Sequence, residues 1–211
     1  MLITKIIKSR MERNSYAVFI DEAPAFQVSD EVLMKFGLLI GKRIDERMVE
    51  EIASAEAFTR ARKIALNFIS YRPRSSKEIV NKLSHKGFPS ELANHVVRHL
   101  REVNLVSDLE FARMLVRDKL RGKPMGKAMI RRKLLEKGIS FQIIERVLKE
   151  YISEEDEQQA ATRLAAKKLK MSRSRFAGLE SVKQQKRLID YLLSRGFSTE
   201  VALKTVRVIF S

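Results

Sequence analysis

One short pattern occurs three times in this chain, each time at the end of a stretch with helical spacing of apolar residues. Each copy has a leucine, a glycine four residues later and a basic residue directly before that glycine, at residues 83–88, 134–139 and 192–197. A serine follows the glycine within three residues (Ser90, Ser140 and Ser198), and a second helical stretch comes next. Glycine supplies the left-handed residue that closes a helix. The glycines recur roughly every 50 to 60 residues, a period that predicts an array of helical units.

The chain has 211 residues and no cysteine. Without cysteine, disulfides and thiolate metal sites are excluded. The sequence contains no run of about 18 apolar residues that could span a membrane, and its first residues lack the apolar core of a secretory signal. We therefore expect a soluble, cytoplasmic protein. Units of roughly 50 residues are near the lower limit for burying a core, so neighbouring units should pack on one another.

The charge is unevenly distributed. The net charge of the whole chain is +16. Residues 60–150 hold 22 Lys and Arg against 9 Asp and Glu, whereas residues 1–59 hold 8 against 10. A basic middle after a slightly acidic beginning indicates a polyanionic partner or an acidic protein surface. The alternative is that these side chains form the solvated faces of helices.

The first residues predict a small β element. Residues 2–8 and 16–21 are rich in β-branched and aromatic residues and are separated by a turn-forming stretch, which predicts a hairpin, with residues 25–28 as a possible third strand. A short helix should run from Ser29 through Phe36 and end near Gly37 and Gly41. A hairpin of this size is stable only when it packs on something larger.

The rest of the chain predicts helices. One long helix should run from about residue 45 to 71, with Ala61, Ile64, Ala65 and Phe68 as its buried stripe, and Pro73 should end it. Capping boxes at residues 75–78 and 107–110 mark later helix starts.

We thus expect a mainly α fold: a tandem array of three three-helix, helix-turn-helix-like repeats with a small N-terminal β-hairpin element, elongated in shape. The expected segments are residues 1–45, 46–105, 106–153 and 154–211. A helix-turn-helix with glycine in its turn is found in DNA-binding proteins, but it is also a general way to pack small helices.

Enzymatic patterns are scarce. There is no phosphate-binding glycine-rich loop, no cysteine nucleophile and no paired carboxylates for two-metal chemistry. Glu91, His95 and His99 have a spacing that would place three metal ligands on one helical face, but a basic helix suits a dication poorly. Solvent-facing histidines are the favoured interpretation. We expect no enzyme, no metal and no cofactor.

The basic stretches are more informative. Between Asp118 and Glu136 the chain has seven cations and no acid, around a loop in which Gly122 and Gly126 would let the backbone approach a partner closely. Upstream, two arginines surround Pro73, and guanidinium groups suit phosphate or carboxylate. Alternatively these two arginines brace helix ends, Tyr71 is a core residue and the seven cations form a solvated face. The candidate contact residues are Arg60, Lys63, Arg72, Arg74, Arg117, Lys119, Arg121, Lys123, Lys127, Arg131, Arg132 and Lys133.

Two short segments of the sequence resemble a known family. Residues 65–75, Ala-Leu-Asn-Phe-Ile-Ser-Tyr-Arg-Pro-Arg-Ser, and residues 105–112, Leu-Val-Ser-Asp-Leu-Glu-Phe-Ala, together with the repeat glycines, resemble the RecX family of recombination regulators. The resemblance is strong over about residues 60–150 and looser in the third repeat. Asn104 and Ser107 stand where the family commonly has Gly and Asp. Asn tolerates the left-handed conformation and Ser caps a helix, so the fold is expected to be kept.

The resemblance implies a modulator of RecA. Members of this family are curved arrays of three three-helix repeats that lie in the groove of the RecA–DNA filament and contact adjacent RecA subunits. They inhibit ATP hydrolysis, strand exchange and co-protease activity, and some bind single- or double-stranded DNA directly. The expected partners are therefore RecA protein and the RecA–DNA filament, with no membrane, and the protein is expected to be a monomer. The alternative is a helix-turn-helix DNA-binding protein that acts without RecA.

Overall fold

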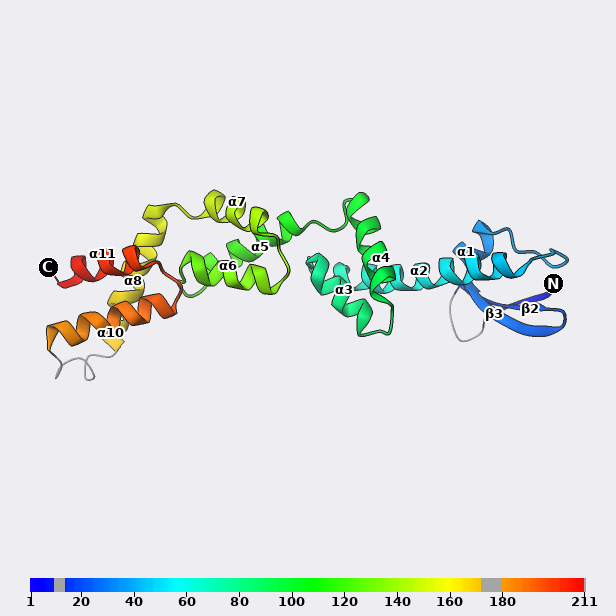
Figure 1. Cartoon of the computed structure of the whole chain (residues 1–211), viewed down its shortest axis with the longest axis horizontal. Helices are drawn as coiled ribbons and strands as arrows, with labels where there is room; N and C mark the ends of the chain where they lie inside the picture. Colours follow the sequence, from blue (N-terminus) through cyan, green and yellow to red (C-terminus); the bar gives the residue numbers. More distant parts are fainter. Residues whose placement is uncertain (10–13, 172–179, 211) are drawn as a thin grey trace. The chain divides into compact units, whose positions relative to one another are not determined.

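The computed structural model describes residues 1–9, 14–171 and 180–210 (Figure 1). By contacts the chain forms two compact units. The first comprises Met1–Pro73 and Ile79–Val103, and the second comprises Arg74–Glu78 and Asn104–Ser211. The expected mainly helical fold with a small N-terminal β element is confirmed. Across the described ranges, no helix is both long enough and apolar enough to cross a membrane.

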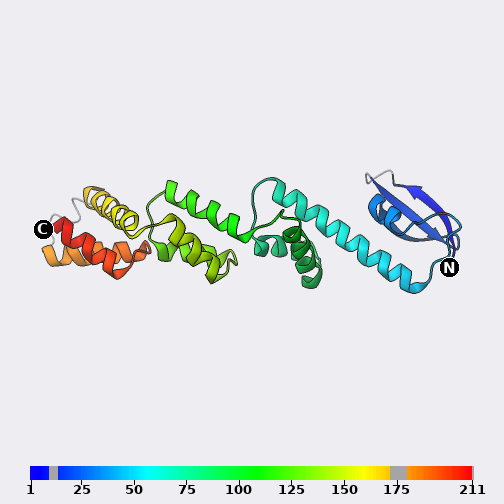
Figure 2. The same cartoon turned by 90° about the horizontal axis from the view of Figure 1, so that it is seen from above.

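The first unit begins with a three-stranded antiparallel sheet in the order β1-β2-β3, formed by Ile3–Lys8, Ser15–Ile20 and Ala23–Ser29. The possible third strand is thus present and longer than expected. Asp21 and Glu22 both have positive φ, 47° and 69°, and form the two-residue turn between β2 and β3. Figure 2 shows the sheet (blue) together with the short helix that follows it.

That helix, α1, spans Asp30–Lys35, and the hydroxyl of Ser29 accepts a hydrogen bond from the Val32 nitrogen at its start. The carboxylate of Glu56 accepts hydrogen bonds from both the nitrogen and the hydroxyl of Ser29, at 2.7 and 2.8 Å. A shared core of buried residues joins the sheet, α1 and the next helix. It consists of Ile3, Val18, Val28, Val32, Leu38, Ile44 and Ile52. The predicted hairpin therefore has the larger support that it needs.

Helix α2 spans Glu46–Ser70, one residue shorter at each end than predicted, and Asp45 caps its start. Ala61 and Ala65 are fully buried, in agreement with the predicted stripe. Helices α3, Ser76–Ser84, and α4, Ser90–Glu102, follow. The predicted capping box at α3 is formed in both directions: the Glu78 nitrogen donates to the Ser75 hydroxyl at 3.2 Å, and the Ser75 nitrogen donates to the Glu78 carboxylate at 3.3 Å.

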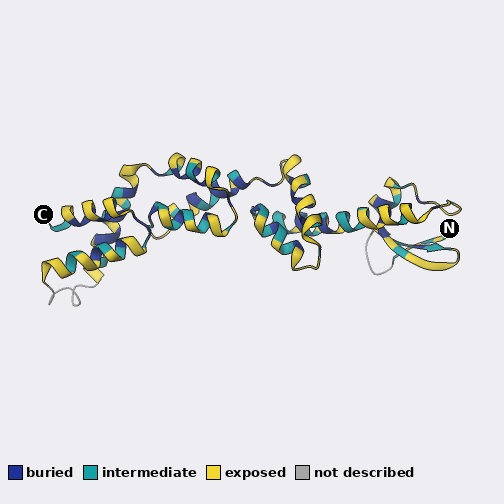
Figure 3. Ribbon diagram, in the orientation of Figure 1, coloured by how far each residue is buried: buried dark blue, intermediate teal, exposed yellow. Residues whose placement is uncertain are grey.

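The second unit contains two groups of three helices. Helices α5, Asp108–Arg121, α6, Lys127–Glu136, and α7, Phe141–Tyr151, enclose a core that includes Phe111, Ile130 and Leu148. Helices α8, Glu154–Met171, α10, Ser181–Ser194, and α11, Thr199–Phe210, enclose a second core around Leu164 and Leu192. Figure 3 shows buried residues on the sides where the helices of a group face one another and exposed residues on the outer sides.

The start of α5 departs from the prediction in one detail. The Ser107 hydroxyl accepts from the Glu110 nitrogen at 3.3 Å, as expected. The Glu110 carboxylate, however, lies 2.7 Å from the guanidinium of Arg113, so the predicted box is formed only in its hydroxyl half. Asn104 has a φ of 58° and takes the left-handed conformation expected of it. The neighbouring Asp108 is buried, and its carboxylate accepts a hydrogen bond from the Ser76 nitrogen at 2.8 Å.

Candidate functional site

The three basic-glycine turns have the same backbone geometry. Gly87, Gly138 and Gly196 have φ values of 86°, 77° and 84°. In each turn the glycine nitrogen donates to a carbonyl oxygen three residues back, at 2.9 Å, and the next nitrogen donates to the leucine carbonyl oxygen, at 3.1 to 3.2 Å. This is the glycine-closed helix end that the sequence predicts.

In the second unit, two of these turns contact the start of a helix that lies earlier in the sequence. The Ser75 hydroxyl donates to the carbonyl oxygen of Lys137 at 2.8 Å, and the Lys137 ammonium lies 2.8 Å from the Glu78 carboxylate. A Cβ at Gly138 would lie 2.7 Å from the Cβ of Lys77. The turn that closes α6 thus covers the first turn of α3.

The second contact of this kind is between main chains. The nitrogens of Gly126 and Ala128, at the start of α6, donate to the carbonyl oxygens of Arg195 and Gly196 at 3.0 and 3.1 Å. A Cβ at Gly126 would lie 2.1 Å from the Gly196 oxygen. The expectation that Gly126 lets the backbone approach a partner is therefore corrected: the close approach is to the chain's own Gly196. We call these two contacts the repeat joints.

Three of the candidate cations are exposed at one end of α5. Arg117 and Arg121 are one helical turn apart and so lie on the same face of the helix. Lys123 follows in the loop, and all three side chains are exposed. Within the described part of the chain none of the three has an ion-pair partner. We call Arg117, Arg121 and Lys123 the exposed cation set.

Two other candidates are paired with acids that lie far along the sequence. The guanidinium of Arg131 meets the carboxylate of Glu145 at two points, 2.6 and 3.0 Å. The ammonium of Lys127 lies 3.4 Å from Glu157, and the Lys127 nitrogen donates to the same carboxylate at 2.9 Å. Acidic side chains from elsewhere in the sequence therefore lie beside this acid-free stretch.

These pairs alter the electrostatics of the carboxylates. The hydrogen bond from Arg131 holds the pKa of Glu145 below its ordinary value, against the opposing effect of desolvation. Glu157 is buried, with only 7% of the residue exposed, so it depends on Lys127 for a counter-charge. Lys127 and Arg131 thus each pair with an acid inside the second unit.

The remaining candidates differ in their surroundings. Arg60 and Lys63 are exposed on α2, and Arg132 forms a long, exposed ion pair with Glu136 at 3.7 Å. Lys119 and Lys133 are half-buried. The twelve candidates therefore differ in exposure and in pairing.

The residues around Pro73 form a further group. Arg72 donates to the Pro73 carbonyl oxygen at 3.1 Å, and Arg74 is half-buried and interacts within the chain. Tyr71 is 84% exposed, which excludes the alternative that it is a core residue.

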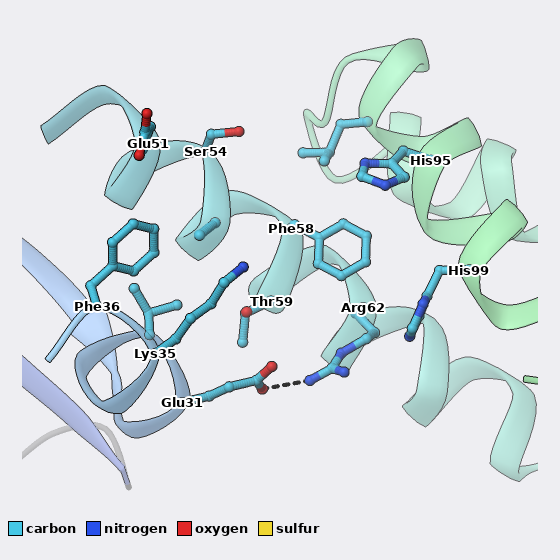
Figure 4. A pocket seen from close by; sticks show the side chains of 13 residues that line it. Glu31, Lys35, Phe36, Glu51, Ser54, Phe58, Thr59, Arg62, His95 and His99 are labelled. Carbon is cyan, nitrogen blue, oxygen red and sulfur yellow. Dashed lines mark hydrogen bonds and ion pairs between the residues drawn. The ribbon is translucent and has the colours of Figure 1, made fainter. Parts of the chain in front are cut away.

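The first unit also has a groove that the sequence did not predict (Figure 4). It has a volume of about 780 Å³ and is lined by α1, α2 and α4. The ring of Phe58 packs against His95 and His99, at centroid distances of 4.8 and 5.6 Å, and Arg62 pairs with Glu31 across the groove. The histidine spacing was the available signal, but these two side chains contact an aromatic ring. Among the described residues no three His, Cys, Asp or Glu are grouped so that they could hold a metal ion.

The chain matches three family models. These are the RecX first three-helix domain at residues 61–100, the second at residues 107–148 and the third at residues 154–206. A regulatory protein RecX of Listeria welshimeri is 34% identical over 202 residues, which is 96% of this chain and 73% of that protein. One of Clostridium botulinum is 30% identical over 97% of this chain and 94% of that protein. The chain belongs to the RecX family.

Solved structures agree with this assignment. A crystal structure of regulatory protein RecX matches with a TM-score of 0.80 and 28% identity, over 96% of this chain and 98% of that one. A RecX structure from Lactobacillus salivarius matches with a TM-score of 0.66 over 74% of this chain, at 24% identity, and so supports the fold alone. The resemblance that the two short motifs predicted is confirmed.

Proposed function

We propose that this RecX-family protein binds RecA and the groove of the RecA–DNA filament, and that it inhibits the recombinase, ATPase and co-protease activities of RecA. The observation that carries the proposal is family membership over nearly the whole chain. The role of a RecA regulator requires binding rather than chemistry. We accordingly propose a monomeric cytoplasmic protein without catalytic activity.

The exposed cation set supplies the charge for such a partner. Arg117, Arg121 and Lys123 are available to phosphates or acidic loops, whereas Lys127 and Arg131 already have acidic partners. One exposed ion pair is worth only about 0–1 kcal/mol. Several together in a partly desolvated groove act jointly and also speed the encounter. We therefore propose that these three residues, with Arg60 and Lys63 on α2, form the main contacts to RecA or DNA.

The direct test is RecA-catalysed ATP hydrolysis and strand exchange, measured with and without the protein. The proposal expects both rates to fall as the protein concentration rises. Unchanged rates at a saturating protein concentration would show that the protein is not an inhibitor of RecA.

A second candidate is DNA binding without RecA, which the exposed cations on α5 also favour. Binding to bare DNA through phosphates weakens steeply as salt rises, in proportion to the number of phosphates neutralised. Affinity for bare DNA and for the RecA-coated filament should be compared at matched salt. We expect preference for the filament, and equal affinity for both would favour the second candidate.

A further inference from the structure

The turn at residues 86–88 is a third copy of the surface used in the two repeat joints. Its hydrogen bonds match those of the other two turns: the Gly87 nitrogen donates to Ser84 at 2.9 Å and the Phe88 nitrogen donates to Leu83 at 3.2 Å. The residue before the glycine is again basic. The turn is therefore shaped like the two that cover a helix start.

Within the described residues of the first unit, this copy is uncovered. Lys86 and Gly87 are exposed, and a Cβ added to Gly87 would meet no atom within 4 Å. Phe88 is half-buried, whereas its counterparts Ile139 and Phe197 are 2% and 3% exposed. The difference is what a missing neighbour would produce.

The two joints show what fits such a turn. In both, the segment that contacts the turn is the start of a helix, whose positive dipole end faces carbonyl oxygens that end another helix. The donor is the Ser75 hydroxyl in the first joint, and the donors are the Gly126 and Ala128 nitrogens in the second. The residue that contacts the turn is small in both joints, Ser75 or Gly126, and at Gly126 an added Cβ would lie 2.1 Å from the Gly196 oxygen. In the first joint a glutamate three residues further on, Glu78, pairs with the basic residue of the turn.

In the third repeat, the counterpart of these two helix starts is not available to a turn. The helix that corresponds to α3 and α6 in the third repeat is α10, and it is longer by about one turn at its N-terminal end. Residue Gln184 occupies the place of Ser75 and Gly126, and its nitrogen already donates to the Glu180 carbonyl oxygen at 3.1 Å. The donors that a turn requires are thus used inside the helix.

We propose that the turn at residues 86–88 is a docking site for the first turn of a helix in a partner protein. The helix should start with Ser, Thr or Gly and carry a Glu or Asp in its first turn, which pairs with Lys86. The inference rests on the proposed function in one respect: it takes RecA in the filament as the protein that supplies this helix.

The absence of cysteine allows a clean test. Lys86→Cys introduces a single thiol, which can be labelled with a maleimide photo-crosslinker and irradiated with the RecA–DNA filament. Peptide mass spectrometry should find the crosslinks in the first turn of one RecA helix. Arg98→Cys, an exposed position on α4, is the matched control and should give a different or weaker pattern. The proposal would be overturned by crosslinks to a strand, to the C-terminal end of a helix or to a second copy of the chain. It would also be overturned if Lys86→Cys gave no more crosslinks than the control.

A charge reversal gives an independent measurement. Lys86→Glu should weaken binding to the RecA filament by about tenfold and leave the melting temperature unchanged, because Lys86 is exposed. Arg98→Glu makes the same charge change and should weaken binding by less than about threefold. Equal losses of binding in the two variants would mean that Lys86 contributes only general electrostatic attraction, and not a specific contact. If the wild-type protein fails to bind RecA, the proposed function itself is wrong, whereas wild-type binding with an unaffected Lys86→Glu variant removes only this inference.

Discussion

The hydroxyl of Ser75 is bonded to two helices at once: it accepts from the Glu78 nitrogen at 3.2 Å and donates to the Lys137 carbonyl oxygen at 2.8 Å. Ser75 is fully buried. One side chain therefore both starts α3 and holds the turn that closes α6. Its removal would leave a partly buried carbonyl oxygen without its donor.

We predict that Ser75→Ala lowers the free energy of unfolding by about 1–2 kcal/mol, near the upper end for a helix cap. Ser107→Ala is the control, because Ser107 is an exposed cap that forms only the hydroxyl half of its box. It should cost about 0.5–1 kcal/mol. Urea unfolding of both variants measures the difference, and equal losses would mean that the bond to Lys137 contributes nothing.

The main-chain joint between Gly126 and Gly196 predicts a strong effect of a single methyl group. Gly126 has a φ of −77°, which any residue adopts, so the effect of Gly126→Ala must come from the 2.1 Å approach to Gly196. We expect a loss of at least about 2 kcal/mol from this overpacking. Gly122→Ala, whose Cβ would meet its nearest atom at 3.6 Å, should change stability by less than about 1 kcal/mol. Comparable unfolding midpoints for the two variants would contradict the close approach of Gly126 to Gly196.

The cations of the basic stretch should separate into two classes. Arg121→Glu combined with Lys123→Glu should leave melting nearly unchanged, because both side chains are exposed, and should reduce RecA inhibition by at least about tenfold, roughly 1.4 kcal/mol of binding. Lys127→Glu should instead destabilise the fold by about 1–3 kcal/mol, since it places a second carboxylate beside the buried Glu157.

Thermal unfolding and RecA ATPase assays on the same preparations test this separation. A stable double variant that inhibits RecA as well as the wild type would show that Arg121 and Lys123 are solvated charges only.

The ion pair of Arg131 and Glu145 predicts a pH dependence of stability. Because the pKa of Glu145 is lowered in the folded state, its contribution is fully present above the ordinary value of 4.5 and is lost as the pH falls through the lowered folded value. Both side chains are about one-third exposed, so we expect only about 0.5 kcal/mol. Wild type and Glu145→Gln should differ in unfolding free energy at pH 7 and converge as the pH falls through the lowered folded pKa of Glu145. A difference that grows on acidification would contradict the assignment.

Local chemistry in the sequence predicted much of the fold. The capping residues at 75–78, the glycines that close helices and the left-handed Asn104 are each determined by a few neighbouring residues, and each was confirmed. The partners of Lys127 and Arg131 could not be predicted in this way. Glu157 and Glu145 approach them only through helix packing, and no local pattern encodes a pairing over 30 or 14 residues. The elongated, curved shape and the contacts to RecA stay predictions.

The repeat joints have a direction along the chain, and this affects how the protein is made. Each of the two joints covers an early helix start with a turn that is translated later: Lys137 covers Ser75, and Gly196 covers Gly126. When α6 emerges from the ribosome, the nitrogens of Gly126 and Ala128 therefore still lack their acceptors, the carbonyl oxygens of Arg195 and Gly196. Synthesis stopped before residue 195 would leave the start of α6 open, so premature termination near the end of the chain should expose a site in its middle.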